Sequence, residues 1–485
     1  MQGCLPRHLF KTQAPHRPDR FGRGFPIFLP TSGHRHIIRC VPPINVHLPL
    51  CPILKKRTAM RRLWSCISVL LSTVLFSGLF AATALADEPV SRPSNNTGNT
   101  RAGDVTRPAE TLEFDPRAVF DEVVQHVQTH FYRPEAINDA WRAHVQRLRP
   151  QVTRVTSRDD LAAVLNELLA TLNASHTHYF STNHPKRYQL LGVFNAMFEQ
   201  DRTDLFVYPG IGIDTRTIDD QTVITAVFDG FAADEAGLRY GDRILHVDGR
   251  PFRGVRSFAK TDGPVVLDIA RGESRRQVTI QPEPLDGRTM FATALTDSVR
   301  VMDVGSRRIG YLHVWSYAGQ KYQDLVRSEL LWGQLAECDA VVIDLRDGWG
   351  GADLNYLNLF RPPIATVQGT SRDGASNSYT GVWERPVAVL TNGGSTSGKE
   401  LFTYGFRKLK LGTVVGETTA GAVLAGRIFL LSNGDVLYLA VSSVAVDGRV
   451  LEGVGVEPDV HVPRAWDAAD DPQLNAAIRE LTSDD

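Results

Sequence analysis

Apolar residues recur at helical spacing in the segment that follows residue 114. Asp115-Pro116 is typical of an N-cap followed by proline at the first helical position. The apolar positions after it are Val119, Phe120, Val123, Val124 and Val127. A second helix is predicted over 139–149, and Ser157 caps a third, whose apolar residues from Leu161 to Leu169 share one face. The third helix is expected to end at 174–179, so this part of the chain is predicted to be helical.

The pattern then changes to short alternating strands between glycine turns, as at Val223 to Val227 and Val265 to Ile269. From about Met290, strands and helices alternate: a strand at 309–314, a helix near 322–335 and a strand at 340–345. This alternation predicts α/β organisation. Farther on, Asn433-Gly434 indicates a hairpin turn between two apolar runs.

One predicted strand-to-helix turn contains a candidate nucleophile. The apolar run 386–390 is followed by Asn392-Gly393-Gly394-Ser395-Thr396-Ser397-Gly398 and then by the helix-like segment 401–406. A serine hydroxyl at such a turn lies beside the free N–H groups and positive dipole end of the helix, which stabilise a developing negative charge. The turn therefore predicts a nucleophilic serine, although an ordinary Ser/Thr helix cap has the same pattern.

A second glycine loop follows the strand at 340–345 and reads Asp344-Leu345-Arg346-Asp347-Gly348-Trp349-Gly350-Gly351. It lacks the Gly-Lys-Ser/Thr ending and the dinucleotide spacing of phosphate-binding loops. Backbone N–H groups in such a loop suit an oxyanion, which favours acyl-transfer chemistry. The loop is also expected to open another helix.

The N-terminal part has the pattern of an export signal. Met60-Arg61-Arg62 is a basic start, Leu63 to Leu79 is an apolar stretch, and Ala84-Leu85-Ala86 offers a cleavage site. A membrane anchor is the alternative, but the stretch is short and interrupted by serines, so no stable anchor is expected. We therefore predict a periplasmic or secreted protein cleaved after Ala86. Residues 1–59 are interpreted as an upstream or disordered extension, and the polar segment 87–110 as a linker.

Charge and cysteine content narrow the function classes. The 485 residues include 53 Lys and Arg against 54 Asp and Glu, and no basic face is evident, which argues against nucleic-acid binding. The five cysteines, Cys4, Cys40, Cys51, Cys66 and Cys338, have no metal-ligand spacing, and a cleaved chain would keep only Cys338, without an internal disulfide. His176 and His178 lack further ligands nearby, so neither a metal nor any other cofactor is predicted.

Two motifs in the β-rich segment resemble a PDZ domain: Gly210-Ile211-Gly212-Ile213, and the run from Ala236 to Gly249 that reads AGLRYGDRILHVDG. In that family the first motif offers backbone N–H groups to the terminal carboxylate of a peptide, which adds a strand to the sheet edge. The alternative is a β-rich insert with a purely structural role.

Five stretches, in order along residues 111 to 465, together resemble the carboxyl-terminal-processing and tricorn-type serine peptidases. They are Ser175-His176, the PDZ-like segment, Asp344-Leu345-Arg346 with Gly350-Gly351, the serine turn continued by Gly412 to Gly421, and Gly455-Val456-Glu457-Pro458-Asp459. The loop sequence Asp347-Gly348-Trp349 departs from the asparagine usual there. The processing branch has a lysine base where this chain has Ala422, so the resemblance is to the tricorn-type branch, which uses a histidine.

That resemblance implies roles for particular residues. Ser397 would be the nucleophile, because the serine of the family stands three places before an acidic residue, here Glu400. His176 would be the base, and Ser175 and Glu452 would orient it. The oxyanion would be held by N–H groups of Gly350, Gly351 and Gly398. Ser395 is the rival nucleophile, and Lys399 and His313 are rival bases; a surface position for Glu452 and a helix-end cap for Ser175 are the alternatives to their catalytic roles.

The implied architecture is a multidomain α/β protein. A helical domain is expected over 111–190, a PDZ domain over 191–284, a peptidase core of the ClpP/crotonase-like kind over 285–465 and a tail over 466–485. The implied function is that of an exported serine endopeptidase acting on peptides or unfolded proteins, including near substrate C-termini. A non-catalytic peptide- or lipid-binding protein on the same fold is the alternative, since relatives have retinoid-binding roles. The sequence indicates no oligomeric state.

Overall fold

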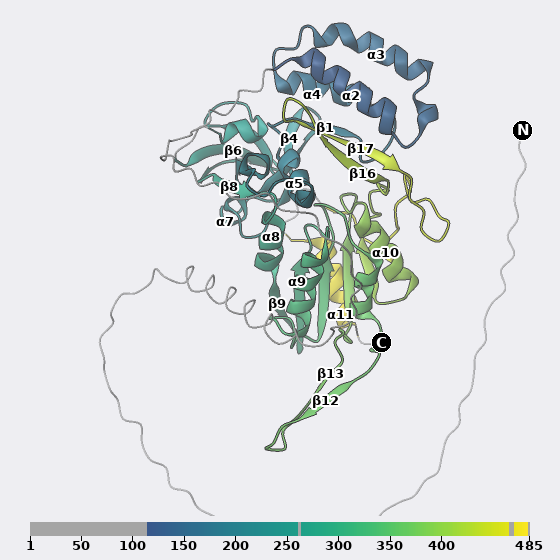
Figure 1. Ribbon diagram of the computed structural model, residues 1–485. Coiled ribbons are helices and arrows are strands. Elements are labelled where there is room, and N and C mark those ends of the chain that lie inside the picture. Colours follow the sequence, from purple (N-terminus) through teal and green to yellow (C-terminus); the bar gives the residue numbers. More distant parts are fainter. Residues whose placement is uncertain (1–113, 260–262, 465–469, 484–485) are drawn as a thin grey trace, which may run out of the picture. The chain divides into compact units, whose positions relative to one another are not determined.

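The computed structural model describes residues 114–259, 263–464 and 470–483 (Figure 1). The predicted signal peptide, the extension 1–59 and the linker 87–110 lie outside these residues, as do the four cysteines before residue 67. All described residues belong to one compact unit, 105–485. None of the helices in the described ranges is long and apolar enough to cross a membrane.

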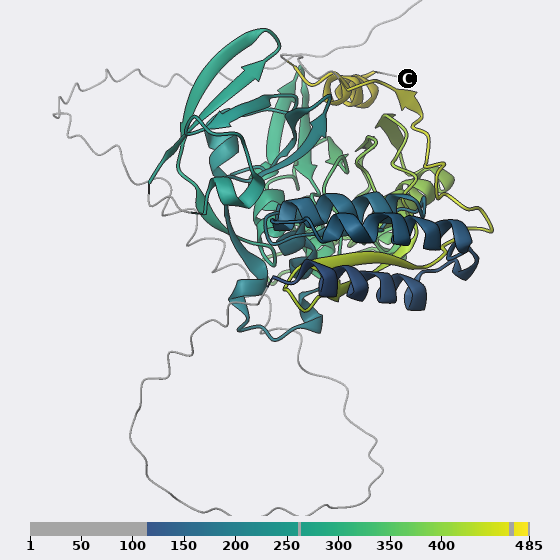
Figure 2. The ribbon, with the colours of Figure 1, turned by 90° about the horizontal axis from the view of Figure 1, so that it is seen from above.

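The first three helices are α2 (Pro116–His130), α3 (Asp139–Val152) and α4 (Arg158–Ala170). Their predicted caps are confirmed: the Asp115 carboxylate accepts hydrogen bonds from two N–H groups of α2, and Ser157 Oγ accepts one from Asp160 N. These helices share a core with a three-stranded sheet, which Figure 2 shows beside them. The strands of this sheet, in spatial order, are β1 (His178–Phe180), β17 (Val436–Ser442) and β16 (Ala425–Leu430).

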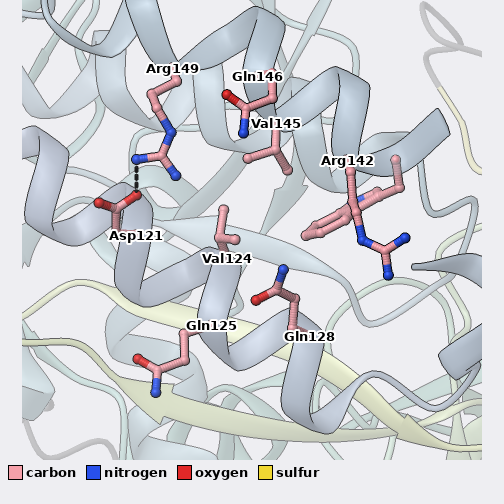
Figure 3. A pocket seen from close by; sticks show the side chains of 9 residues that line it. Asp121, Val124, Gln125, Gln128, Arg142, Val145, Gln146 and Arg149 are labelled. Carbon is pink, nitrogen blue, oxygen red and sulfur yellow. Dashed lines mark ion pairs between the residues drawn. The ribbon is translucent and has the colours of Figure 1, made fainter. Parts of the chain in front are cut away.

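A groove of about 330 Å³ lies between α2 and α3 (Figure 3). An ion pair at its rim joins Asp121 to Arg149 at 2.6 Å. None of the predicted site residues lines this groove.

A β-rich part follows α5 (Pro185–Val193), η2 (Asn195–Met197) and α6 (Thr203–Phe206). Its five-stranded antiparallel sheet keeps the chain order: β3 (Ile213–Ile218), β4 (Gln221–Val227), β5 (Arg243–Val247), β6 (Val265–Arg271) and β7 (Ser274–Ile280). The short strands β2 (Val207–Gly210) and β8 (Glu283–Asp286) pair with each other at its base, and α7 (Ala232–Glu235) and η3 (Gly254–Ser257) complete it. The alternating strands predicted here are confirmed, and their inward residues form a separate apolar core.

The largest sheet has six strands. In spatial order they are β18 (Val460–His461), β15 (Thr413–Gly416), β14 (Val387–Thr391), β11 (Ala340–Asp344), β10 (Arg307–His313) and β9 (Arg300–Val304). All pair in parallel except β9, which is antiparallel at one edge. Every residue of β11 and β14 is buried, which explains why both strands are apolar up to their last residues, Asp344 and Thr391. The predicted α/β organisation is therefore confirmed.

Helices cover both faces of this sheet. One face packs against α8 (Met290–Ser298), α9 (Gln320–Leu331), η4 (Leu354–Phe360) and α10 (Gly398–Lys408), and the other against α11 (Pro472–Thr482). The hairpin of β12 (Val367–Thr370) and β13 (Ser376–Tyr379) has only exposed residues. The neighbouring strands β11 and β14 are parallel, so the loops that follow their carboxyl ends meet at one edge of the sheet. These two loops contain the predicted oxyanion glycines and the predicted nucleophile.

Candidate active site

Ser397 lies at the junction between β14 and α10. It is the N-cap of α10, so the predicted strand-to-helix turn is confirmed. Its backbone has φ 56° and ψ −125°, a conformation that costs a non-glycine residue about 1–3 kcal/mol. Such strain persists only where the surrounding structure imposes it, and it places the serine at the positive end of a helix dipole.

The surroundings that impose this conformation centre on Glu400, one turn into α10. Ser397 N donates to Ala422 O at 2.8 Å and to Glu400 Oε1 at 3.1 Å. The fully buried Glu400 carboxylate also accepts hydrogen bonds from Thr419 Oγ1, Gly421 N and Ala422 N at 2.6, 2.8 and 2.7 Å. Burial raises the pKa of Glu400, and these hydrogen bonds oppose that shift. This role of Glu400 was not predicted, although an acidic residue three positions after an N-cap serine is typical of a capping box.

The glycine loop after β11 packs directly against Ser397. A Cβ atom added at Gly350 would lie 2.6 Å from Ser397 Cβ, and one added at Gly398 would lie 2.3 Å from Ala352 N. Only glycine fits at either position without moving the backbone. Within the described residues, the N–H groups of Gly350, Gly351 and Gly398 donate no hydrogen bond to protein atoms. Unengaged backbone donors therefore lie next to the serine, as an oxyanion site requires.

Ser175, His176 and Glu452 form a connected chain of hydrogen bonds. Ser175 Oγ donates to Glu452 Oε2 at 2.8 Å and lies 2.8 Å from His176 Nδ1. Glu452 also accepts from Ser175 N at 2.8 Å through Oε1 and from Val423 N at 2.9 Å through Oε2. The structure thus brings together three predicted site residues from segments 277 positions apart in the sequence.

His176 is buried, and its backbone has φ 56°. Burial lowers its pKa to about 4; the Glu452 carboxylate opposes this shift, and His178 adds to it. The ring packs against Tyr438, with 5.1 Å between the ring centroids, and the Trp349 ring of the glycine loop contacts the same tyrosine at 6.4 Å. The imidazole is therefore neutral at neutral pH, with one nitrogen engaged by Ser175.

Two consecutive residues connect Ser397 to this chain of hydrogen bonds. Ala422 O accepts from Ser397 N, and the next residue, Val423, donates its N–H to Glu452. In the described part of the chain no hydrogen bond joins Ser397 to the His176 ring, whose Nδ1 pairs with Ser175. Catalytic hydrogen bonds are often formed only when substrate binds.

Comparison with known proteins identifies the relatives of this chain. Residues 308–462 match the family model described as Peptidase family S41, and residues 113–170 match the tricorn protease C1 domain. Over these residues the chain is similar to peptidase family S41 and to the tricorn proteases. The predicted resemblance to carboxyl-terminal-processing and tricorn-type peptidases is thereby confirmed.

Among its relatives is the putative tricorn protease homolog 2 of Streptomyces coelicolor, 28% identical over 406 residues, which are 76% of this chain and 32% of that protein. The chloroplastic carboxyl-terminal-processing peptidase 1 of Arabidopsis thaliana is 26% identical over 338 residues, 64% of this chain and 65% of that protein. The chain therefore spans less than two thirds of either relative. The structure of the photosystem II D1 C-terminal processing protease aligns with 77% of this chain and 98% of its own, at 18% identity and a TM-score of 0.44.

The rival candidates Ser395 and His313 make contacts that fit structural roles. Ser395 is fully buried; its hydroxyl donates to Leu345 O at 2.8 Å and accepts from Asn392 N at 3.1 Å. His313 ends β10, with Nε2 2.9 Å from Arg346 O, and its ring stacks on Trp315. Burial lowers the pKa of His313 to about 4. Neither side chain makes a hydrogen bond to Ser397 in the described ranges.

The glycine loop is also anchored from outside the sheet. The Asp347 carboxylate, at the start of the loop, forms an ion pair of 2.5 Å with Arg464. The Arg464 guanidinium in turn lies over the Tyr240 ring, 3.5 Å from its centroid. This contact connects the loop of the S41 segment to the β-rich part, and no feature of the local sequence pattern indicated it.

The predicted peptide-binding residues occupy the junction of β2 and β3. Gly210 ends β2, Ile213 begins β3, and both isoleucines are buried in or beside the core of the β-rich part. In the part that the structure describes, the N–H groups of Ile211 and Gly212 donate no hydrogen bond. The cavity beside them is only about 20 Å³, enough for a water molecule but not for a peptide side chain. Phe252 and Phe258 are among the residues that line it.

Proposed function

We propose that this chain, like the S41 peptidases it resembles, is a serine endopeptidase in which Ser397 is the nucleophile and His176 the general base. The observation that carries the proposal is the set of unengaged N–H groups of Gly350, Gly351 and Gly398 beside a strained serine. Such donors serve a negatively charged oxygen that forms only during acyl transfer. A serine that merely caps a helix needs no second loop of free donors packed against it.

These residues would carry out the proposed hydrolysis of a peptide bond. Ser397 Oγ attacks the scissile carbonyl carbon while His176 Nε2 takes the hydroxyl proton, and the carbonyl oxygen becomes an oxyanion held by the glycine N–H groups. His176 next gives that proton to the leaving amine, which breaks the C–N bond and leaves an acyl ester on Ser397. Water, deprotonated by the same ring, hydrolyses the ester and frees the serine.

Ser175 and Glu452 orient the base in this scheme. His176 Nδ1–H donates to Ser175 Oγ, whose own hydroxyl donates to Glu452 Oε2, which fixes the ring tautomer that exposes Nε2. When the imidazolium forms, the carboxylate charge stabilises it through the serine hydroxyl. Because Glu452 also takes two backbone N–H bonds, its position is set before substrate arrives.

Labelling with a fluorophosphonate tests this proposal on the full-length protein and on the chain starting at residue 87. Wild type should be labelled at Ser397, as identified by mass spectrometry of the modified peptide. Ser397→Ala and His176→Ala should abolish labelling, whereas Ser371→Ala, in the exposed hairpin, should keep it. A folded wild type that is not labelled would favour the non-catalytic binding protein, and a label on Ser395 would refute the assignment.

For substrate choice, we propose that the β-rich part acts as a PDZ domain that binds the C-terminus of peptides or unfolded proteins. The unengaged N–H groups of Ile211 and Gly212 support this, since they suit a terminal carboxylate. One peptide prepared with a free and with an amidated C-terminus gives the test. The amidated form should have a KM several-fold higher with similar kcat; equal KM values would exclude recruitment through the carboxylate.

Export is the remaining part of the proposal, and the pattern of residues 60–86 supports it. N-terminal sequencing of the protein from the periplasm or medium of an expressing bacterium should give Asp87 as the first residue. Protein that stays in the cytoplasm with residues 60–86 attached would refute it.

A further inference from the structure

Lys399 is a fully buried lysine two residues after the proposed nucleophile. It belongs to α10, its side chain is 0% exposed, and it is among the largest completely buried side chains of the described chain. Burying an ammonium group is costly unless it is paired. Yet within the described residues Lys399 has no carboxylate oxygen within ion-pair distance, and its partners are backbone carbonyls.

Both carbonyls belong to the support of the glycine loop. Lys399 Nζ donates to Asp347 O at 2.6 Å and, more weakly, to Trp315 O at 3.5 Å. Trp315 O also accepts from Trp349 N at 2.8 Å, and a Cβ atom at Gly348 would lie 1.9 Å from it. The ammonium thus joins the first residue of the loop to the strand end on which the loop rests.

The carboxylates near Lys399 are already paired with arginines, so the ammonium charge is available to the two carbonyls. Asp344, at the end of β11, and Asp347 attract the ammonium, but Asp344 is paired with Arg346 and Asp347 with Arg464. His313, at the end of β10, faces the same group and is neutral at neutral pH because burial lowers its pKa to about 4. A methionine would fill the same space without the cost of burying a charge, so packing alone does not explain a lysine here.

We propose that Lys399 is a positioning residue for the peptidase reaction: its ammonium holds the 347–351 loop so that the Gly350 and Gly351 N–H groups face the oxyanion. This inference rests on the proposed function. Lys399 does not act as the base in place of His176, because its nitrogen donates to two carbonyls and makes no hydrogen bond to Ser397 in the described residues. It acts on the reaction through the loop.

The loop should loosen when Lys399 loses its proton. Burial lowers the pKa of Lys399 to about 7, while Asp344 and Asp347 oppose that shift. A neutral amine lacks the charge that strengthens its bonds to the Asp347 and Trp315 carbonyls. The kcat of the wild type should therefore fall as pH rises through about 7, while KM stays nearly constant.

The experiment measures kcat and KM between pH 5 and 9 for wild type, Lys399→Met and Lys399→Arg, on the full chain. Lys399→Met should lower kcat at pH 6 by about tenfold to a hundredfold, as a displaced oxyanion loop does, with KM within about twofold and no further fall above pH 7. Lys399→Arg keeps the charge, so it should retain most of the kcat and lose the fall at pH 7. Phe406→Leu, a buried change on the same helix, controls for lost stability and should keep the wild-type profile.

Each outcome decides one question. A Lys399→Met variant with wild-type kcat and an unchanged pH profile would overturn the inference and leave the lysine a packing residue. If neither Lys399 variant folds, the wild type still decides, because a kcat that is constant from pH 6 to 9 overturns the inference. Wild type that fluorophosphonate does not label refutes the proposed function itself, which is a separate result.

Discussion

Gly350→Ala perturbs the proposed oxyanion site by a single methyl group. The added Cβ atom would lie 2.5 Å from Thr396 O, 2.6 Å from Ser397 Cβ and 2.9 Å from Gly398 N. Ordinary contacts begin near 3.4 Å, so the loop must move by about 0.5 to 0.9 Å, the differences between 3.4 and these distances. A hydrogen bond of about 2.9 Å stretched by that amount is largely lost.

The expected loss follows from this displacement. Removing one oxyanion donor lowers kcat roughly 10²- to 10³-fold, or about 2.7–4 kcal/mol of transition-state stabilisation. The same overpacking costs about 1–3 kcal/mol of folding free energy. Kinetics must therefore be measured well below the unfolding temperature, with the folded fraction checked by circular dichroism. We expect kcat to fall by that factor, with KM changed less than threefold.

Gly393→Ala is the matched control for this change. Gly393 lies in the turn that contains Ser397, but a Cβ atom there would meet no atom within 4 Å. Its kcat should stay within about twofold of wild type, because no donor is displaced. A Gly350→Ala enzyme with near-native kcat, or a Gly393→Ala enzyme that loses as much, would refute the assignment of the glycine loop to the oxyanion.

Three further predictions test the base and its support. Glu452→Gln removes the charge behind His176 and should lower kcat on the order of 10³- to 10⁴-fold with little change in KM. A native kcat in steady-state kinetics would show that the hydrogen bonds from Glu452 through Ser175 to His176 are not used in catalysis. Because burial lowers the pKa of His176 to about 4, the ring stays neutral to acidic pH, so on the acid side kcat/KM should fall only as pH drops through about 4; a fall on acidification through 6.5 would contradict this. Asp435→Asn breaks the largely buried pair with Arg158 and should lower the free energy of unfolding in urea by about 3 kcal/mol, whereas Glu167→Gln, in an exposed pair, should change it by less than about 1 kcal/mol.

Elements with strong local signals were predictable from the sequence. The helix α2 has its cap, its N-terminal proline and its apolar stripe within fifteen residues, and β11 is a short apolar run that ends at Asp344. The glycine loop was predicted to open a helix. The structure has a 3-10 helix that begins at Leu354, three residues after the last glycine, and the Asp353 side chain caps it by accepting from Asn355 N at 2.7 Å. Its start depends on that capping side chain rather than on the glycines.

The position of Ser397 could also be predicted from the local sequence. A strand, a glycine turn and a helix lie within about twenty residues, and the chemistry of the turn decides where the hydroxyl lies. The sequence pattern did not indicate that Glu400 holds Ser397 through Gly421 and Ala422, since those residues follow about twenty positions later. Nor did it reveal the contacts of the buried Lys399 ammonium, because its two acceptors come from the segment after β10 and from the glycine loop, far away in the chain.

The hydrogen bonds between Ser175 and Glu452 show the physical reason why such long-range contacts could not be predicted from the sequence. Ser175 and Glu452 are 277 positions apart, so no local propensity relates them. They meet because the first helices share one core with β16 and β17, and Asp435, between those strands, binds Arg158 of α4 and the Tyr179 hydroxyl of β1. That docking places the loop between α4 and β1, which contains His176, beside the segment after β17. The position of His176, the proposed base, is therefore a consequence of tertiary packing, so loosening the Asp435 contacts should weaken catalysis as well as stability.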